Sequence, residues 1–247
     1  MWEDILLYIA VGFAAQMVDG AIGMAYGITS STVLLSLGIS PATASACVHT
    51  AETVTTAASG LSHWKFGNVD WKLVRRLALP GAIGGSVGAY ALAHIDGNVI
   101  KPYIAGYLVL MGAYILWRAF REVPQQKQPP RHVSSLGFVG GLLDAIGGGG
   151  WGPVVTTTLI GSGTTPRYAI GSVNLSEFFV TLTISATFLF TIGLELFPII
   201  AGLMIGGLVA APFAAYVTQS LPDKVLMKIV GIVIILLSLR TIAMALH

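Results

Sequence analysis

Eight long stretches of the chain consist almost entirely of apolar residues. They lie at about 4–37, 42–62, 73–93, 101–120, 133–161, 167–192, 196–217 and 225–246. Each exceeds the roughly 18 residues that an α-helix needs to cross the apolar core of a bilayer. A membrane-spanning strand would instead alternate polar and apolar residues over about 10 positions, and the chain carries no such alternation. The pattern therefore predicts an all-α integral membrane protein.

Composition and charge support this class. The 247 residues are 55% hydrophobic and only 10% charged, against about 25% charged residues in an ordinary soluble domain. Glu3 and Asp4 stand where a signal peptide would carry Lys or Arg, so we expect a retained first helix rather than a cleaved leader. The single cysteine, Cys47, excludes an intrachain disulfide and a cysteine-rich metal site.

A polar, proline-rich segment, REVPQQKQPPRH at 121–132, divides the chain almost in half. Such a composition is typical of a linker. We therefore predict a first repeat at 1–121, a cytoplasmic linker at 122–132 and a second repeat at 133–247, which together form one membrane domain.

The two halves resemble each other in sequence. A shift of 125 residues aligns DGAIGMAYG at 19–27 with DAIGGGGWG at 144–152. The same shift, without a gap, aligns SPATASACVHTAE at 40–52 with TPRYAIGSVNLSE at 165–177. Further along, a shift of 122 aligns IGGSVGA with IGGLVAA. Internal repeats of this kind are typical of secondary transporters.

The first segment of each repeat is long for one helix and has a glycine break in its middle, which suits a hairpin that enters the membrane and returns. If both segments are re-entrant, the halves are inverted; otherwise the chain crosses eight times. The re-entrant arrangement places 11 of the 13 Lys and Arg residues on the cytoplasmic side, and eight crossings place 9 there. The positive-inside rule favours two inverted repeats of about four hydrophobic segments each.

The glycine cluster DAIGGGGWGP at 144–153 lies inside an apolar run, where each glycine costs a helix about 1 kcal/mol relative to alanine. A helix interrupted there leaves N–H groups unpaired, and these groups together with the helix dipole attract anions. At membrane depth such a break must face protein or a watery cavity. We expect substrate contacts from Gly23, Tyr26, Gly27, Ser30, Gly147, Gly148, Gly149, Gly150, Trp151, Gly152 and Asn174. For Gly84, Gly85, Gly206 and Gly207 we expect close helix packing instead.

Four acidic residues alone lie well inside hydrophobic segments, and they form two repeat-related pairs: Asp19 with Asp144, and Glu52 with Glu177. No Lys or Arg lies at comparable depth, and burial of an unpaired carboxylate costs several kcal/mol or more. The acids are therefore protonated, hydrated or bound to a cation, and we expect them to carry protons. His49 shares a helix face with Glu52 and can relay a proton, although an interhelical hydrogen bond is an equal alternative. For the acids the alternative is a purely structural role.

Signals for other functions are weak. Cys47 and His49 lie on different helix faces, so they do not form a catalytic dyad, and the chain has no GxSxG, HExxH or phosphate-binding lysine motif. We expect no catalytic residues, no metal site and no cofactor. Aromatic residues near segment ends are interpreted as interfacial anchors; they are Trp64, Trp71, Trp117, Tyr103 and Tyr107. Lys65, Lys72, Arg75 and Arg76 are interpreted as topology determinants rather than a nucleic-acid patch.

Each half opens with a glycine-rich stretch, VDGAIGMAYG or LLDAIGGGGWGP, which is followed by a Ser-Pro or Thr-Pro helix start. With the polar linker between them, the two halves resemble the TauE/SafE sulfite exporter family. The resemblance spans essentially the whole chain. It implies transport of a small sulfur-containing anion, such as sulfite, sulfoacetate or a related organosulfonate, across the bacterial inner membrane. The first half has Met24 and Ala25 where the second has Gly149 and Gly150, so the two half-sites need not bind equally.

The sequence thus predicts a multi-pass secondary transporter that exports such an anion, with proton coupling and alternating access. The rival hypothesis is a cation/proton exchanger, because four unpaired carboxylates suit a metal or sodium ion as well as a proton. The expected partners are the small anionic substrate and the lipid bilayer, without nucleic acid, and a homodimer is compatible with the sequence.

Overall fold

The chain is almost entirely helical. The computed structural model describes residues 4–22, 24–121, 132–162, 164, 166–193, 197–220 and 223–245, and among them there is no strand. The elements are α1 (Ile5–Ile22), α2 (Tyr26–Ser36), α3 (Pro41–Lys65), α4 (Trp71–His94), α5 (Gly97–Arg118), α6 (Val133–Gly147), the π-helical turn η1 (Gly152–Thr156), α7 (Thr157–Gly161), α8 (Pro166–Thr191), α9 (Phe197–Ser220) and α10 (Asp223–Ala245). The predicted all-α class is confirmed. The predicted linker at 122–132 lies, except for its last residue, outside the described residues.

Capping residues explain several helix starts. Ser40 precedes Pro41 and accepts a hydrogen bond from the backbone N–H of Thr43, as the Ser-Pro pattern predicts for the start of α3. Asp70 accepts hydrogen bonds from two backbone N–H groups in the first turn of α4. Asp96 does the same for one N–H group at the start of α5. These side chains satisfy donors that a helix leaves unpaired at its N-terminus.

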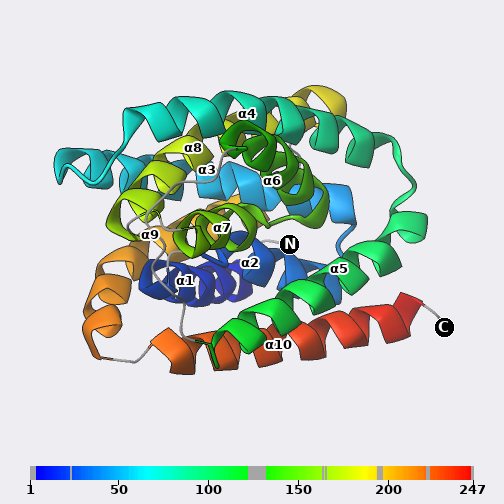
Figure 1. Ribbon diagram of the computed structural model, residues 1–247. Coiled ribbons are helices and arrows are strands. Elements are labelled where there is room, and N and C mark those ends of the chain that lie inside the picture. Colours follow the sequence, from blue (N-terminus) through cyan, green and yellow to red (C-terminus); the bar gives the residue numbers. More distant parts are fainter. Residues whose placement is uncertain are drawn as a thin grey trace.

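The helices pack in pairs that join the two halves of the chain. α1 packs along α9, α6 along α4, α3 along α8, and α5 along α10. In addition, α8 contacts α4 and α3 contacts α9, so α3 and α8 lie at the centre of the bundle. Figure 1 shows α4 at the top and the α5–α10 pair at the bottom, with the remaining helices between them.

Glycines allow two of these pairs to approach through their backbones. Gly84 in α4 faces the backbone of Phe138 in α6, and Gly206 in α9 faces the backbone of Ile9 in α1. Gly85 lies against the side chain of Ile184, and Gly207 lies against Thr55 and the ring of Tyr26. The prediction that these four glycines serve close helix packing is confirmed. A side chain at either backbone contact would force the helices apart.

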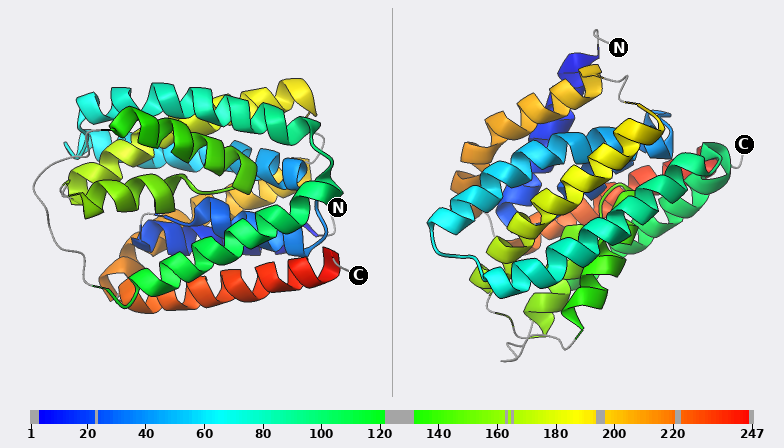
Figure 2. Two further views of the ribbon diagram at one scale, coloured as in Figure 1. Left: turned by 45° about the vertical axis from the view of Figure 1, so that its right-hand side comes forward. Right: turned by 90° about the horizontal axis from the view of Figure 1, so that it is seen from above.

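Both glycine-containing segments interrupt their helices, as predicted. α1 ends at Ile22 and α2 begins at Tyr26, while α6 ends at Gly147 and the helix resumes at Gly152. Ala25, Gly148 and Gly149 have φ angles of 102°, 68° and 148°, which L side chains rarely adopt and glycine tolerates. Figure 2 shows the link between α6 and η1 running through the interior of the bundle. Gly23 lies outside the described residues.

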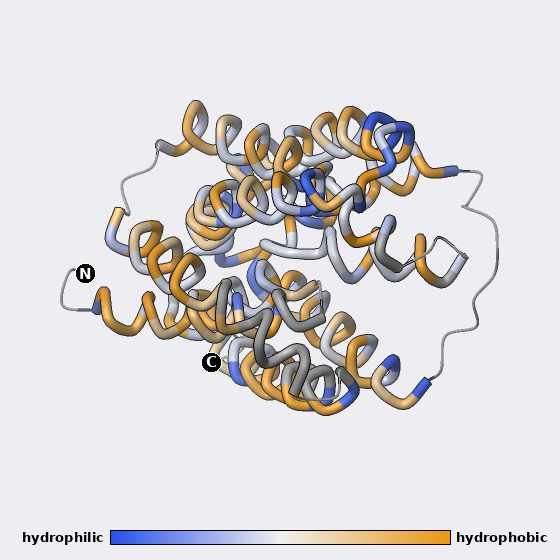
Figure 3. The backbone as a smooth tube through the Cα atoms, turned by 90° about the vertical axis from the view of Figure 1, so that its left-hand side faces the viewer, coloured by the Kyte–Doolittle hydropathy of each residue, from blue (hydrophilic) through white to orange (hydrophobic). Residues whose placement is uncertain are grey.

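Two helices in the described part of the chain are long and apolar enough to cross a membrane by themselves: α5 and residues 168–191 of α8. The sequence predicts eight such segments. Shorter apolar stretches of the described residues lie in α1, α6, α9 and α10, at Ile5–Asp19, Val133–Gly147, Phe197–Ala211 and Gly231–Met244. Hydrophobic residues nevertheless run along most helices (Figure 3).

Candidate functional site

The four acids predicted from the sequence line one small cavity between the two interrupted segments. Asp19 comes from α1, Glu52 from α3, Asp144 from α6 and Glu177 from α8. The remaining lining residues belong to the two breaks and the helix starts after them; they are Ala25, Gly27, Ile28, Gly149, Gly150, Trp151, Gly152 and Pro153. The volume open to the centre of a water molecule is about 10 Å³, so the cavity has room for about one water molecule.

Asp144 is the most heavily bonded of the four acids. Its Oδ1 accepts hydrogen bonds from the backbone N–H groups of Gly150, at 2.7 Å, and Trp151, at 3.0 Å. Its Oδ2 lies 3.2 Å from Nε2 of His49. The carboxyl group therefore accepts hydrogen bonds from the backbone N–H groups at the start of the second half-helix, where the sequence predicts that an anion binds. A substrate anion at these amides would have to compete with Asp144.

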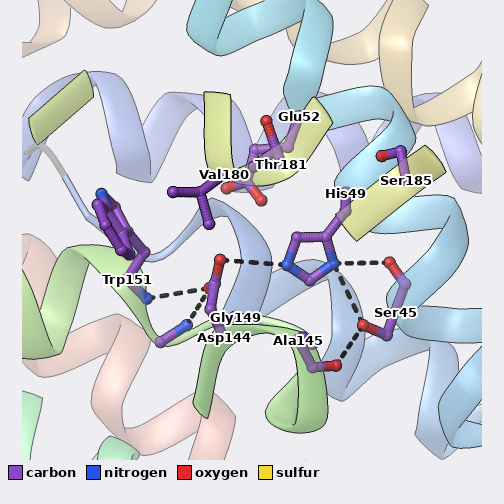
Figure 4. Close-up of polar contacts among 12 residues, drawn as sticks. Ser45, His49, Glu52, Asp144, Ala145, Gly149, Trp151, Val180, Thr181 and Ser185 are labelled. Atoms are coloured by element: carbon purple, nitrogen blue, oxygen red, sulfur yellow. Dashed lines mark hydrogen bonds and ion pairs between the residues drawn. The ribbon is translucent and has the colours of Figure 1, made fainter. Parts of the chain in front are cut away.

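His49 is fully buried and joins α3 to the end of α6. Its Nδ1 lies 2.8 Å from the backbone carbonyl oxygen of Ser45. A carbonyl oxygen only accepts, so Nδ1 must carry a proton. The Ser45 hydroxyl lies 3.2 Å from the same nitrogen and donates to the carbonyl oxygen of Ala145 at 2.6 Å. Figure 4 shows this chain of contacts from Ser45 through His49 to Asp144.

The hydrogen bonds of His49 define how many protons it and Asp144 hold together. Because Nδ1 donates to Ser45, the hydrogen bond between Nε2 and Oδ2 needs one more proton, on either atom. The pair is then either a neutral imidazole with a carboxylic acid or an imidazolium with a carboxylate. In both cases its net charge is zero, which is why two such groups can be buried together.

Asp19 occupies the corresponding position at the first break but has fewer partners. Its Oδ1 accepts one long hydrogen bond, of 3.4 Å, from the backbone N–H of Tyr26. The residue aligned with His49 by the repeat is Asn174, and its side chain bonds elsewhere. Asn174 donates to the carbonyl oxygen of Ile170 and accepts from Ser59, so it links α8 to α3.

Glu52 and Glu177 enter the cavity from the two central helices. Glu52 is buried, and its Oε2 has no hydrogen-bond partner among the described residues. A Cβ atom added at Gly27 would lie 3.5 Å from this oxygen, so Glu52 reaches the first break. The same Cβ atom would lie 2.8 Å from the Cα atom of Gly149, so at this point the two interrupted segments are in direct backbone contact.

Three side chains donate hydrogen bonds to backbone carbonyl groups near the second break, and the sequence did not predict these hydrogen bonds. The Ser31 hydroxyl donates to the carbonyl oxygen of Gly148, and the Tyr107 hydroxyl donates to that of Gly149 at 3.4 Å. Tyr107 was expected to be an interfacial anchor; its ring instead packs against Gly147. Ser45 completes the set. No spacing rule identifies these residues, because their contacts depend on how α2, α3 and α5 are rotated against the break.

The other residues predicted to bind a substrate are divided between the cavity and the packing around it. Gly27, Gly149, Gly150, Trp151 and Gly152 line the cavity. The Trp151 ring is fully buried and packs against Gly81 and Gly140, while the Tyr26 hydroxyl donates to the carbonyl oxygen of Leu203. Ser30 is buried, and its hydroxyl has no partner among the described residues. Gly147 and Gly148 lie beneath Tyr107 and Ser31, and Gly23 lies outside the described residues.

Among the described residues, no three or more His, Cys, Asp or Glu side chains form a group that could hold a metal ion. One of the four acids, Asp144, is paired with His49.

Comparison with known proteins covers nearly the whole chain. Residues 8–241 match the family described as "Sulfite exporter TauE/SafE". The chain is 43% identical over 249 residues to the "Probable membrane transporter protein YtnM" of Bacillus subtilis (strain 168), and the alignment covers 97% of this chain and 83% of that protein. No solved structure matches the chain.

Proposed function

The chain belongs to the TauE/SafE sulfite exporter family, and from this premise we propose that it exports a small sulfur-containing anion, such as sulfite, sulfoacetate or a related organosulfonate. It is a membrane transporter and not an enzyme. The proposed location is the bacterial inner membrane, with several crossings, and the proposed mechanism is secondary transport coupled to protons.

The observation that carries the proposal is the shared cavity. Four acids and both interrupted segments meet at one place, and no Lys or Arg is among the described residues that line it. An anion next to four carboxylates is repelled unless most of them are protonated. Anion binding and proton binding are therefore linked, and by reciprocity each raises the affinity for the other. This linkage is what the coupling of anion movement to proton movement requires.

Helix packing supports the proposal that the halves are repeats. Gly12 in α1 faces Leu203 in α9, and Gly137 in α6 faces Leu77 in α4. Gly137 follows Gly12 by 125 residues, while Leu203 follows Leu77 by 126, four more than the shift of 122 that aligns α4 with α9. Related contacts are therefore made with the halves exchanged, displaced by about one helical turn. Such an exchange is expected of two repeats related by a twofold axis, as in inverted-repeat transporters.

Two further observations support a re-entrant hairpin in the second half. α6 has 15 residues, a length of roughly 22 Å, which is shorter than the bilayer core of about 30 Å. Gly140 in α6 also lies against Val155 in η1, so the chain folds back beside itself after the break. We propose the same course for α1 and α2. Each repeat, 1–121 and 133–247, would then cross the membrane three times.

The coupling role is tested with Glu177→Gln in membrane vesicles. The neutral amide cannot release a proton, so flux driven by a proton gradient should be abolished while exchange of labelled anion continues. Glu52→Gln is the matched variant on the other central helix and should behave in the same way. Gradient-driven flux that survives in both variants would disprove proton coupling through these acids.

The second candidate function is a cation/proton exchanger. It is favoured by one observation, since the Oε2 atom of Glu52 is buried, with no hydrogen-bond partner among the described residues, in a cavity lined by three more acids. A thermal-shift screen of the purified protein separates the two functions, because a ligand that binds only the folded state raises the melting temperature. Stabilisation by sulfite or a sulfonate supports the anion exporter. Stabilisation by sodium or calcium alone supports the exchanger.

A further inference from the structure

A second hollow lies on the outer side of the bundle, away from the cavity of the four acids. It is a groove of about 620 Å³ between α4 and α8. Gly81 lies against Val180 and Gly85 against Ile184, so the two helices run side by side in the same direction along it. The groove is lined by Trp71, Val74, Arg75, Ala78, Leu79 and Ala82 of α4 and by Phe179, Leu182 and Thr183 of α8.

The lining of this α4–α8 groove is apolar along its length and charged near one end. Ala78 and Ala82 contribute small side chains to the lining, and the side chains of Leu79 and Leu182 are 69% and 45% exposed. The Thr183 hydroxyl donates to a carbonyl oxygen of its own helix and offers the groove no free donor. Such a surface suits a hydrocarbon chain.

Among the described residues of the lining, Arg75 alone is charged, and it lies one turn into α4. Lys72 is exposed on the preceding turn, and the carboxylate of Asp70 is engaged by the N–H groups at the helix start. Beside them, Trp64 and Trp71 pack edge to face with ring centroids 6.0 Å apart. Trp pairs next to basic residues are typical of the lipid headgroup level.

We infer that the α4–α8 groove binds an anionic phospholipid, with one acyl chain between the helices and the phosphate against Arg75. The guanidinium group binds phosphate with two hydrogen bonds, and Lys72 adds a second positive charge nearby. A choline headgroup would bring a further cation toward these residues, whereas the headgroup of phosphatidylglycerol brings none. The lipid therefore lies on the outer side of α8, whose inner side carries Glu177 into the cavity of the four acids.

The test measures lipid retention by the purified full-length protein. Native mass spectrometry follows the binding of phosphatidylglycerol and phosphatidylcholine with identical acyl chains. The wild-type protein should prefer phosphatidylglycerol by about fivefold, the effect expected of one basic residue at a membrane surface. Arg75→Gln should remove the preference and Arg75→Lys should keep most of it. Equal binding of the two lipids by the wild type would overturn the inference, and so would a preference that persists in Arg75→Gln.

The apolar part of the groove is tested by filling it. Leu182→Trp places a large side chain in the groove, and Leu189→Trp makes the same change on α8 at a residue of similar exposure outside it, since the two leucines are 45% and 49% exposed. The first variant should lose the retained lipid and the second should not. Retention by Leu182→Trp at the wild-type level would place the lipid elsewhere. None of these outcomes depends on which ion the protein transports.

Discussion

Asp19 and Asp144 each lie seven residues before the aromatic residue at which the helix resumes, and each accepts a hydrogen bond from the backbone N–H of that residue. Their surroundings differ. Asp144 has a second N–H donor and His49, while among the described residues Asp19 accepts one long hydrogen bond. The residue that aligns with His49 in the second half, Asn174, is directed toward Ser59. A repeated sequence has therefore produced two related half-sites with one specialised proton pair.

The largest effect is expected from removing the two aspartates in turn. Asp144→Ala leaves two buried N–H groups and His49 without a partner, which should cost about 3–5 kcal/mol of unfolding free energy. Asp19→Ala removes one long hydrogen bond and should cost about 1 kcal/mol. Thermal unfolding in detergent measures both. Equal losses of unfolding free energy would show that the additional hydrogen bonds of Asp144 do not stabilise the fold.

His49 tests whether the proton pair belongs to one half-site only. His49→Gln leaves Oδ2 of Asp144 without its imidazole and should cost about 1–3 kcal/mol. It should also flatten the pH dependence of transport, measured as initial rates in vesicles. Adding Asn174→His should not restore that dependence, because residue 174 faces Ser59 rather than Asp19. Restoration would mean that the two half-sites are interchangeable.

Ser45 offers a finer test because it acts on His49 and does not line the cavity. Ser45→Ala removes the hydroxyl that bonds Ala145 and lies beside Nδ1 of His49, at a cost of about 1 kcal/mol. Ser176→Ala is the control, since its buried hydroxyl bonds only the backbone of its own helix. Nitrogen NMR of the histidines and the pH profile of transport should change in the first variant and not in the second. A matching change in the control would assign the effect to packing alone.

The smallest effect is expected at the first break, where Ala25 has a positive φ and the second half has Gly150. Ala25→Gly should relieve backbone strain and raise the unfolding free energy by up to about 1 kcal/mol. Ala44→Gly makes the same change inside α3, where it should lower stability by about 0.5–1 kcal/mol. The unfolding free energies of the two variants, measured by chemical unfolding, should therefore change in opposite directions relative to the wild type. A shift in the same direction would mean that Ala25 is not strained.

Much of this arrangement could be predicted from the sequence because it depends on local signals. Apolar runs predict helices, and clustered glycines predict the interruptions that the structure has between Ile22 and Tyr26 and between Gly147 and Gly152. The duplicated acids predict a common cavity, because residues at equivalent positions of two repeats meet when the repeats pack together. Glu52 and Glu177 both line it.

The bonding within the site could not be predicted, because it depends on tertiary packing. Tyr107 has the spacing of an interfacial residue, and only the position of α5 brings it to Gly149. Trp151 lies in the expected segment, yet its ring packs against Gly81. The sequence also does not reveal that Asp144 takes the N–H groups of the second half-helix. Spacing along the chain places a residue on a helix face, but the neighbouring helix decides what that face meets.

The backbone contact between Gly27 and Gly149 limits the size of a molecule that fits between the two interrupted segments. A sulfur atom bearing three oxygens is larger than the single water molecule for which the cavity has room. If the proposed anion crosses through this cavity, the two glycine backbones have to separate, and a side chain at residue 27 would keep them apart, because its Cβ atom would lie 2.8 Å from the Cα atom of Gly149. The smallest residues in the chain thus determine how tightly the pathway can close.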